Sequence, residues 1–319
     1  MGDILVLTNK IFDLAEGAEA EIREITSKLD LKVVESRIDY SELIKEAEIV
    51  FGWPKTKLVK KAKNLKWLHL PSAGVDRYAN KDLYQNQDIL LTNSSGVYGK
   101  PIAEHVFAMI LAHNRNLIDY AYNKKEKIWQ RQNNIKDLFN STVGILGLGD
   151  IGSSIAKRAN SWGAQVLALK RTMIEPPDYV DQIYLTEDLD KLLRKSDYVI
   201  LTLPGTPETE GIIGRSELQL MKNSAFIVNI GRGSLIDQGA LIKALEEGEI
   251  GGAGLDVTET EPLPESSKLW ELENVILTPH ISGFSPTNAQ RQFEIFKDNL
   301  KRYLNQEELL NQIDFDLKY

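Results

Sequence analysis

The feature that most constrains the fold is a glycine-rich turn set between an apolar run and a helical stretch. Residues 142–159 read TVGILGLGDIGSSIAKRA, in which Gly147, Gly149 and Gly152 follow the spacing GxGxxG. In such a turn the first glycine permits a tight bend, the second lets the backbone approach a pyrophosphate, and the third allows the helix to pack closely. The strand before the turn, the helix after it and a second strand beyond predict a doubly wound unit that binds a dinucleotide.

Short apolar runs alternate with amphipathic stretches along the chain, a pattern typical of parallel sheets with crossover helices. The 319 residues exceed the size at which a single hydrophobic core usually keeps growing, so two domains are expected. The second strand series is complete before residue 284, and we therefore expect the final helix to return to the first domain. The expected strands span 4–7, 32–38, 49–52, 65–70 and 89–93, then 143–146, 166–169, 198–203, 225–230, 254–257 and 275–277.

The fold class that follows is α/β, with two doubly wound domains. We expect a Rossmann cofactor domain at residues 98–284, inserted into a flavodoxin-like substrate domain formed by residues 1–97 and 285–319. A helix that opens near Pro101 and the polar stretch 123–140 after it are interpreted as a bridge between the domains.

The lysine-rich stretch 55–66 places Leu58, Ala62 and Leu65 at positions i, i+4 and i+7. This spacing predicts a helix whose lysines lie on the solvated face. A binding site for an anionic partner is the second interpretation of the same residues.

Composition excludes several classes of function. The formal net charge is −8, which argues against binding to nucleic acid or to an anionic membrane, because such binding depends on Lys and Arg that neutralise phosphates. The chain has no cysteine, so disulfides, thiolate catalysis and cysteine-ligated metal are excluded, and we expect no metal site. No apolar run approaches the roughly 20 residues of a membrane span, and the first one is too short for a signal peptide. A cytoplasmic soluble protein is expected.

The choice of cofactor is expected to depend on the end of the second strand, where residues 165–172 read QVLALKRT. An acid at this position would accept a hydrogen bond from the ribose 2′-hydroxyl of NAD(H) and would repel a 2′-phosphate. Lys170, Arg171 and Thr172 instead offer two cations and a hydroxyl, which favours NADP(H). The alternative is that they are solvated strand-end residues of an enzyme that uses NAD(H) through other contacts.

Of the four histidines, His280 is the strongest candidate for proton transfer. It follows Pro279 just past a strand, at the carboxyl edge where open α/β sheets bind ligands. His105 and His113 lie within a helix pattern, where a packing or solvent role is expected. His69 lies in a strand that precedes a loop and is a distant second candidate.

Two further polar residues follow other strands of the same series. Glu261 lies in GLDVTETEPLP, and Arg232 lies in VNIGRGSLID. Groups at three strand ends predict one crevice, in which a carboxylate fixes the tautomer of His280 and raises its proton affinity. An arginine fork matches a substrate carboxylate and its adjacent carbonyl oxygen. Beside a nicotinamide, this trio fits the reduction of a 2-oxo acid.

The segments PSAGVD, GLGDIG, VNIGRG, GLDVTETEP and TPHISG occur in this order between about residues 65 and 285. Together they resemble the D-isomer-specific 2-hydroxyacid dehydrogenase family, in particular its glyoxylate and hydroxypyruvate reductases. The resemblance implies that Arg232 binds and polarises the substrate, that His280 is the acid/base and that Glu261 is its partner. An acid at Glu261 argues against the formate-oxidising branch, where an amide stands at that place.

The resemblance also assigns residues to the cofactor and the substrate. The residues expected to bind the cofactor are Gly147, Gly149, Asp150, Ile151, Gly152, Lys170, Arg171, Thr172, Leu203, Pro204, Thr209, Ile230 and Asp256. Asp256 is expected to hold the nicotinamide carboxamide, or else to be a turn acid at a strand end. The loop 202–209 is expected to line the adenosine and pyrophosphate, or else to be a plain turn.

For the substrate, the resemblance adds the first domain to Arg232 and His280. The further residues expected there are Trp53, Ser72, Ala73 and Gly74. The backbone amides of the small residues in PSAGVD are expected to grip the substrate carboxylate, because the backbone must come close. Trp53 either closes over the substrate side chain or has a packing role.

The leading hypothesis is an NAD(P)-dependent 2-hydroxyacid dehydrogenase that reduces a small 2-oxo acid to the D-2-hydroxy acid, with NADPH preferred and His280 as proton donor. Glyoxylate, hydroxypyruvate or a branched 2-oxo acid is the expected substrate. Short-form phosphoglycerate dehydrogenase is an alternative within the class, and a non-enzymatic dinucleotide-sensing protein is an alternative from another class. The resemblance further implies a homodimer formed through the helix near Pro101 and the polar arm after it, with Trp129 as an anchor.

Overall fold

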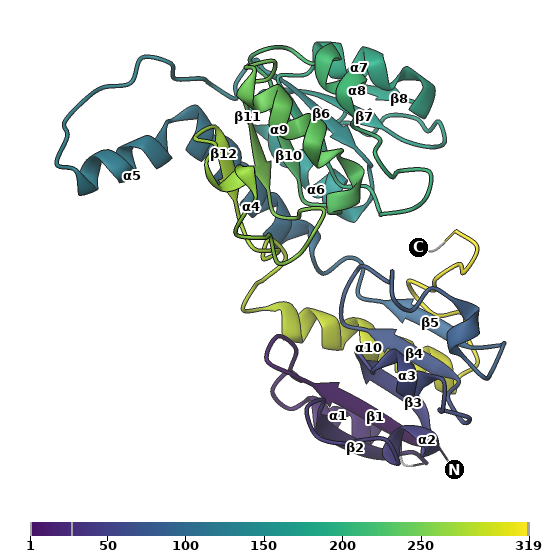
Figure 1. Ribbon diagram of the computed structural model, residues 1–319. Coiled ribbons are helices and arrows are strands. Elements are labelled where there is room, and N and C mark those ends of the chain that lie inside the picture. The colour runs from purple at the N-terminus through teal and green to yellow at the C-terminus, as the bar shows by residue number, and fades with distance from the viewer. Residues whose placement is uncertain (1, 27, 318–319) are drawn as a thin grey trace. The chain divides into compact units, whose positions relative to one another are not determined.

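The computed structural model describes residues 2–26 and 28–317, and the chain divides into two compact units (Figure 1). One unit consists of Met1–Val97 and Ser285–Tyr319, and the other of Tyr98–Phe284. Each unit is built on a parallel sheet with a hydrophobic layer on either face, so the predicted α/β class with two doubly wound units is confirmed. No helix in the described part of the chain is long and apolar enough to cross a membrane.

The first unit contains a five-stranded sheet in the flavodoxin order β2-β1-β3-β4-β5. Its strands are β1 (Asp3–Thr8), β2 (Asp30–Glu35), β3 (Ala47–Gly52), β4 (Trp67–Leu70) and β5 (Leu90–Asn93). Its helices are α1 (Ala18–Ile25), α2 (Leu43–Glu46), α3 (Thr56–Val59), the 3-10 helix η1 (Lys81–Leu83) and α10 (Asn288–Leu304). Phe296 of α10 stacks on Phe51 and Trp67 of the sheet, with ring centroids 4.4 and 5.2 Å apart. The last helix therefore completes the core of the first unit.

The second unit contains a seven-stranded sheet in the order β12-β11-β10-β9-β6-β7-β8. Its strands are β6 (Thr142–Leu146), β7 (Gln165–Leu169), β8 (Gln182–Tyr184), β9 (Tyr198–Leu201), β10 (Phe226–Asn229), β11 (Gly252–Leu255) and β12 (Val275–Leu277). Its α-helices are α4 (Gly99–Asn114), α5 (Leu117–Lys125), α6 (Asp150–Ser161), α7 (Leu189–Lys195), α8 (Arg215–Leu220) and α9 (Gln238–Glu246). Its 3-10 helices are η2 (Thr186–Asp188), η3 (Gly233–Leu235) and η4 (Lys268–Trp270). The strand order reverses between β6 and β9, where a doubly wound sheet opens a crevice at its carboxyl edge.

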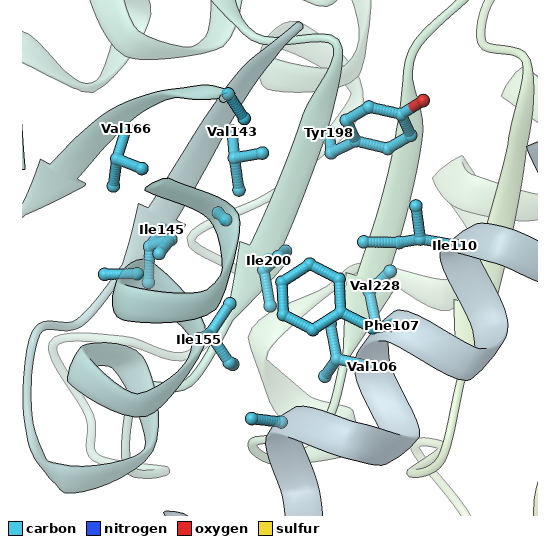
Figure 2. Packing of buried hydrophobic residues seen from close by; sticks show 14 of the residues in the cluster. Val106, Phe107, Ile110, Val143, Ile145, Ile155, Val166, Tyr198, Ile200 and Val228 are labelled. Carbon is cyan, nitrogen blue, oxygen red and sulfur yellow. The ribbon is translucent and has the colours of Figure 1, made fainter. Parts of the chain in front are cut away.

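Two layers of apolar side chains hold helices against this sheet. On one face, Val106 and Phe107 of α4 and Ile155 of α6 pack on Ile200 and Val228 of the strands (Figure 2). On the other face, the helices α7, α8 and α9 bury leucines against the same strands. Burying one such side chain contributes about 1.5–3 kcal/mol. These layers fix the positions of the strand ends, from which the polar loops of the candidate site extend.

The sequence pattern does not predict β8, and it misplaces several strand ends. β8 has only three residues at the edge of the sheet, so it is too short to give a periodic pattern. β2 ends at Glu35, three residues before the expected Ile38, and β11 begins at Gly252 in place of Gly254. β11 ends at Leu255, two residues before the expected Val257, so Asp256 stands directly after the strand.

The lysine-rich stretch 55–66 is not the helix that its spacing predicts. α3 has one turn, because the backbone N–H groups of Lys61 and Ala62 donate to carbonyls three residues back and tighten the chain into turns. Leu58, Ala62 and Leu65 are nevertheless buried, and the lysines are exposed. The predicted division into a buried and a solvated side is therefore correct, although the helix is not.

The helix near Pro101 and the polar stretch after it belong to the second unit. α4, α5 and residues 123–140 lie inside Tyr98–Phe284. Most of the apolar residues of α4 are buried, and several of them cover one face of the seven-stranded sheet. The interpretation of this segment as a bridge between domains is wrong, because α4 is part of the core of one of them.

Candidate active site

The glycine-rich turn joins β6 to α6. Gly147 has a φ of +103°, in the region that favours glycine. A Cβ atom on Gly152 would lie 2.0 Å from the carbonyl oxygen of Gly147, so only glycine lets α6 pack this closely on the turn. A Cβ atom on Gly149 would meet no atom of the described residues within 4 Å. The turn thus leaves open space at the N-terminus of α6, where the N–H groups of Asp150 and Ile151 begin the helix.

Two polar side chains hold this turn in place. Oγ1 of Thr202, which follows β9, donates to the carbonyl oxygen of Gly147 at 2.7 Å. Oδ2 of Asp150 accepts a hydrogen bond from the backbone N–H of Gly99, at the start of α4, at 3.0 Å. The side chain of Asp150 is therefore committed to α4, which leaves its backbone N–H as the group available to a cofactor.

The loops after β9 and β10 contribute the next candidate cofactor residues. Cδ2 of Leu203 lies 3.1 Å from the position that a Cβ atom on Gly147 would take. Oγ1 of Thr209 donates to the carbonyl oxygen of Pro204 at 2.7 Å and so closes the loop after β9. Ile230 follows β10 and is buried. Residues from three neighbouring strands thus gather at the carboxyl edge of this sheet.

The residues expected to select the cofactor follow β7, the neighbour of β6. The backbone N–H of Lys170 donates to the carbonyl oxygen of Tyr184 at 2.9 Å, which fixes the chain at the end of the strand. The side chain of Lys170 is half-buried, and Arg171 and Thr172 are exposed. The stretch 165–174 contains no carboxylate. The end of β7 therefore presents positive charge and a hydroxyl.

Arg232 follows β10 in a loop that Asn229 stabilises. Nδ2 of Asn229 donates to the carbonyl oxygen of Arg232 at 2.8 Å, and its Oδ1 accepts from the N–H of Gly231 at 3.1 Å. A Cβ atom on Gly233 would lie 2.0 Å from the carbonyl oxygen of Thr258, so this loop packs directly on the loop after β11. Asn229 lies within the motif VNIGRG, but the sequence alone assigns it no role, because its hydrogen bonds depend on the loop geometry.

His280 and Glu261 form a hydrogen-bonded pair. Nδ1 of His280 lies 2.8 Å from Oε2 of Glu261, and Oε1 of Glu261 accepts from the N–H of Thr258 at 3.2 Å. A carboxylate accepts hydrogen bonds only, so Nδ1 carries a hydrogen and Nε2 remains for proton transfer. The side chains are 54% and 39% exposed, which leaves the pair accessible to a substrate.

Asp256 is buried behind His280 and organises the loop that carries it. Its Oδ1 accepts from Oγ1 of Thr278 at 2.6 Å and from the N–H of Ile281 at 2.9 Å, and its Oδ2 accepts from the N–H of Ser282 at 2.9 Å. Burial opposes the ionisation of Asp256, but hydrogen bonds from the side chains of Ser282 and Thr278 and from the two backbone N–H groups hold its pKa below the usual value. Asp256 is thus an ionised anchor for residues 278–282.

The two histidines of α4 differ in their surroundings. The ring of His113 stacks on Phe226 at a centroid distance of 4.3 Å, and burial, followed by the charge of Lys136, lowers its pKa to about 4. The expected packing role of His113 is confirmed. His105 instead lies 3.0 Å from Oγ1 of Thr278 through its Nε2. The expected packing or solvent role does not describe this contact, which no helix pattern reveals.

In the first unit, the loop after β4 carries Ser72, Ala73 and Gly74. Nε1 of Trp53 donates to Oγ of Ser72 at 3.0 Å, and that hydroxyl donates to the carbonyl oxygen of Gly74 at 2.8 Å. Nδ2 of Asn93 donates to the carbonyl oxygen of Ala73 at 2.6 Å. Within residues 2–26 and 28–317, no acceptor is found for the backbone N–H groups of Ser72, Ala73 and Gly74. Trp53 therefore supports a fixed loop with three N–H groups available.

His69 is a core residue of the first unit. It is fully buried, and burial lowers its pKa to about 3. Its Nδ1 lies 2.7 Å from Oγ1 of Thr92, which itself accepts from Nε1 of Trp67, and its Nε2 lies 3.3 Å from Oγ of Ser94. Both ring nitrogens are thus satisfied inside the protein. The expectation that His69 is a second candidate for the site is wrong, because neither nitrogen is accessible.

Comparisons with known proteins identify the family to which this chain is similar. The family model described as D-isomer specific 2-hydroxyacid dehydrogenase, NAD binding domain, matches residues 107–282. The chain is 38% identical to a glyoxylate reductase of Korarchaeum cryptofilum over 233 residues. The aligned region covers 70% of this chain and 69% of that protein. It is 31% identical over 314 residues to a glycerate dehydrogenase of Methylorubrum extorquens, with 93% and 97% covered. A D-isomer specific 2-hydroxyacid dehydrogenase from Xanthobacter autotrophicus Py2, solved in complex with NADPH and MES, has a TM-score of 0.85 at 28% identity, with 100% of both chains covered.

Proposed function

Because the chain belongs to the D-isomer specific 2-hydroxyacid dehydrogenase family, we propose that it reduces a small 2-oxo acid to the D-2-hydroxy acid with NADPH as the preferred cofactor. Members of this family are oxidoreductases that use a nicotinamide cofactor. The observation that carries the proposal is the 2.8 Å hydrogen bond between Nδ1 of His280 and Oε2 of Glu261, in the same unit as the glycine-rich turn.

His280 is the proposed proton donor in the reductive direction. Its Nδ1 hydrogen is accepted by Glu261, so Nε2 delivers a proton to the oxygen of the substrate as that oxygen gains negative charge. The carboxylate stabilises the protonated ring before the transfer. Because the His280 side chain is 54% exposed, water can return a proton to Nε2 after each turnover.

The glycine-rich turn fits a dinucleotide, because the space beside Gly149 is open and the N-terminus of α6 attracts negative charge. The backbone N–H groups of Asp150 and Ile151 are the proposed donors to the pyrophosphate, and Leu203 and Ile230 are proposed to line the bound cofactor. When bound, the reduced nicotinamide supplies the hydride.

For the substrate, we assign the carboxylate and the reacting carbonyl to Arg232. A guanidinium fork binds both oxygens and favours negative charge on the carbonyl oxygen. In the first unit, the available N–H groups of Ser72, Ala73 and Gly74 are the proposed further donors to the carboxylate.

The preference for NADPH rests on the end of β7. Lys170, Arg171 and Thr172 would donate hydrogen bonds to a 2′-phosphate, and no carboxylate in the stretch 165–174 would repel it. A charge-assisted hydrogen bond contributes roughly 1.5–3 kcal/mol. The specificity constant kcat/KM is therefore expected to favour NADPH over NADH by about one to two orders of magnitude.

The named relatives guide the substrate proposal. One is a glyoxylate reductase and another a glycerate dehydrogenase, so glyoxylate and hydroxypyruvate are the proposed substrates, with branched 2-oxo acids as competitors. The test is oxidation of NADPH and of NADH with a panel of 2-oxo acids that includes 3-phosphohydroxypyruvate. Turnover of a small 2-oxo acid supports the proposal. Tight cofactor binding without turnover of any acid would favour a dinucleotide sensor.

A homodimer is proposed from the exposed apolar residues of α5 and the arm after it. Leu117, Ile118 and Tyr122 are each more than half exposed, and Trp129 is fully exposed. Large apolar side chains gathered on a surface are typical of interaction sites. Sedimentation velocity tests the proposal: we expect a dimer for the natural chain and a shift toward monomer for the double variant Tyr122→Ser with Trp129→Ser, whereas a natural monomer would contradict it.

A further inference from the structure

The face of α4 that lies over β11 ends at His105. His105, Met109 and His113 are spaced four residues apart and therefore share one side of the helix. A Cβ atom on Gly254 would lie 2.9 Å from Sδ of Met109, and one on Gly252 would lie 3.3 Å from Cε1 of His113, so the glycines of β11 let the helix come close. His105 is one turn nearer the carboxyl end of the strand than Met109. This register brings His105 to the loop that follows β12.

There His105 ends a chain of hydrogen bonds. Its Nε2 lies 3.0 Å from Oγ1 of Thr278, and Oγ1 of Thr278 donates to Oδ1 of Asp256 at 2.6 Å. A hydroxyl has one hydrogen, and Thr278 gives it to Asp256. Nε2 of His105 must therefore be a donor, and the tautomer with hydrogen on Nε2 is assigned. The three groups form a directed series from His105 through Thr278 to the carboxylate, and Nε2 of His105 also lies 3.8 Å from Oδ1 of Asp256, beyond hydrogen-bond distance.

The carboxylate at the end of this series fixes the backbone around the proposed proton donor. Asp256 accepts from the N–H groups of Ile281 and Ser282 through its side chain, and its carbonyl oxygen accepts from the N–H of His280 at 2.8 Å. His280 itself has a φ of +51°, a left-handed conformation that is uncommon for a residue with a side chain. The oxygens of Asp256 thus accept hydrogen bonds mainly from the loop formed by residues 278–282.

We propose that His105 is a positioning residue: through Thr278 it directs a hydrogen onto Asp256 and so holds His280 in its left-handed conformation. His105 is a neighbour of the loop and does not touch the reacting atoms. The proposal rests on the proposed function only in taking His280 as the proton donor. The effect of His105 on the loop itself does not depend on that role.

The test compares three variants of the full-length protein. His105→Leu removes the donor and keeps an apolar side chain of moderate size, His105→Gln keeps an N–H donor at the end of a flexible chain, and Glu104→Gln is a matched control on the exposed side of α4. We expect His105→Leu to lower kcat roughly three- to tenfold, in the range of one lost hydrogen bond, while the Kd for NADPH stays within about twofold. His105→Gln is expected to recover most of kcat, and Glu104→Gln is expected to match the natural protein.

A double-mutant cycle that combines His105→Leu with Thr278→Val shows whether His105 acts through the hydroxyl of Thr278. If it does, the double variant His105→Leu with Thr278→Val has the kcat of Thr278→Val alone, because the chain is already broken. Independent, additive losses would overturn the proposal. So would a kcat for His105→Gln as low as that of His105→Leu, since the ring would then matter only for packing.

Amide hydrogen exchange gives a readout that needs no turnover. In His105→Leu, the N–H groups of His280, Ile281 and Ser282 are expected to exchange about three- to tenfold faster, while the helices of the unit keep their protection. Unchanged exchange at these three amides would overturn the proposal even if kcat fell. If His280→Ala retained full turnover while the exchange prediction held, the role of His280 would fail and the positioning role of His105 would stand.

Discussion

The two ends of the seven-stranded sheet are organised differently at the same carboxyl edge. Beyond β11 and β12, polar side chains bond to one another: Glu261 to His280, and Thr278 to the buried Asp256. Beyond β7, the cationic stretch has a backbone fixed by the hydrogen bond from Lys170 to β8 and side chains that reach the surface. Hydrogen bonds within the protein hold the side chains after β11 and β12, whereas the side chains after β7 present positive charge at the surface.

The difference matches the roles that we propose for the two ends. A proton donor must be held in one place and one tautomer before the substrate arrives, and hydrogen bonds within the protein achieve this at the time of folding. Recognition of a phosphate needs only positive charge within reach, because the ligand itself orders the side chains. Substitutions at the first end are therefore expected to remove turnover, and substitutions at the second to change a preference.

The largest expected effect is at His280. His280→Ala removes the proposed proton donor and is expected to lower kcat by roughly two to four orders of magnitude, as for the loss of general acid catalysis. The Kd for NADPH, measured by fluorescence titration, is expected to change little. A kcat near that of the natural protein would show that the constrained end of the sheet is not where the proton is transferred.

The partner of His280 is expected to have the next largest effect. Glu261→Gln keeps a hydrogen-bond acceptor for Nδ1 but removes the charge that stabilises the protonated ring, so kcat is expected to fall roughly 10- to 100-fold. A variant with the natural kcat would show that Glu261 only stabilises its own loop.

A change of preference is expected at the other end. Lys170→Asp with Arg171→Ala introduces an acid for the ribose 2′-hydroxyl and removes the positive charge, and the ratio of kcat/KM for NADPH over NADH is expected to fall by about one to two orders of magnitude. The kcat with saturating NADH is expected to stay within about threefold of the natural value. A large loss of kcat with both cofactors would contradict the expectation that substitutions after β7 change only the cofactor preference.

The smallest expected effect comes from salt. Exposed charges are screened as the Debye length shortens from roughly 14 to 6 Å between about 0.05 and 0.3 M salt, so the KM for NADPH is expected to rise about two- to fivefold. The KM for NADH is expected to change less than twofold over the same range. An equal change in KM for NADPH and NADH would mean that the positive charge at the end of β7 does not bind the 2′-phosphate.

The parts of the molecule that a local pattern can encode were predictable from the sequence. The glycine spacing gives the turn after β6, and apolar runs give every strand except β8, whose three residues carry no period. The pairing of His280 with Glu261 was predicted because both residues follow strands of one parallel sheet, whose ends must meet at one edge.

The parts that depend on which face of an element meets which neighbour were not predictable. His105 and His113 lie in the same helix pattern and share one expectation, yet His113 stacks on Phe226 and His105 bonds to Thr278. That outcome depends on how close α4 comes to β11, which is set by Gly252 and Gly254 at a distance in the sequence of about 150 residues from the helix. No local periodicity contains this information.

The second unit begins and ends at nearly the same place. A Cβ atom on Gly283, close to the end of Tyr98–Phe284, would lie 3.1 Å from Cδ1 of Tyr98. A segment whose ends meet closes a surface loop of a host protein with little extra entropy, which is why such segments tolerate insertion. Residues 98–284 therefore form a segment that recombination between related genes can exchange as a whole, and the proposed cofactor-binding residues would be exchanged with it without a new linker.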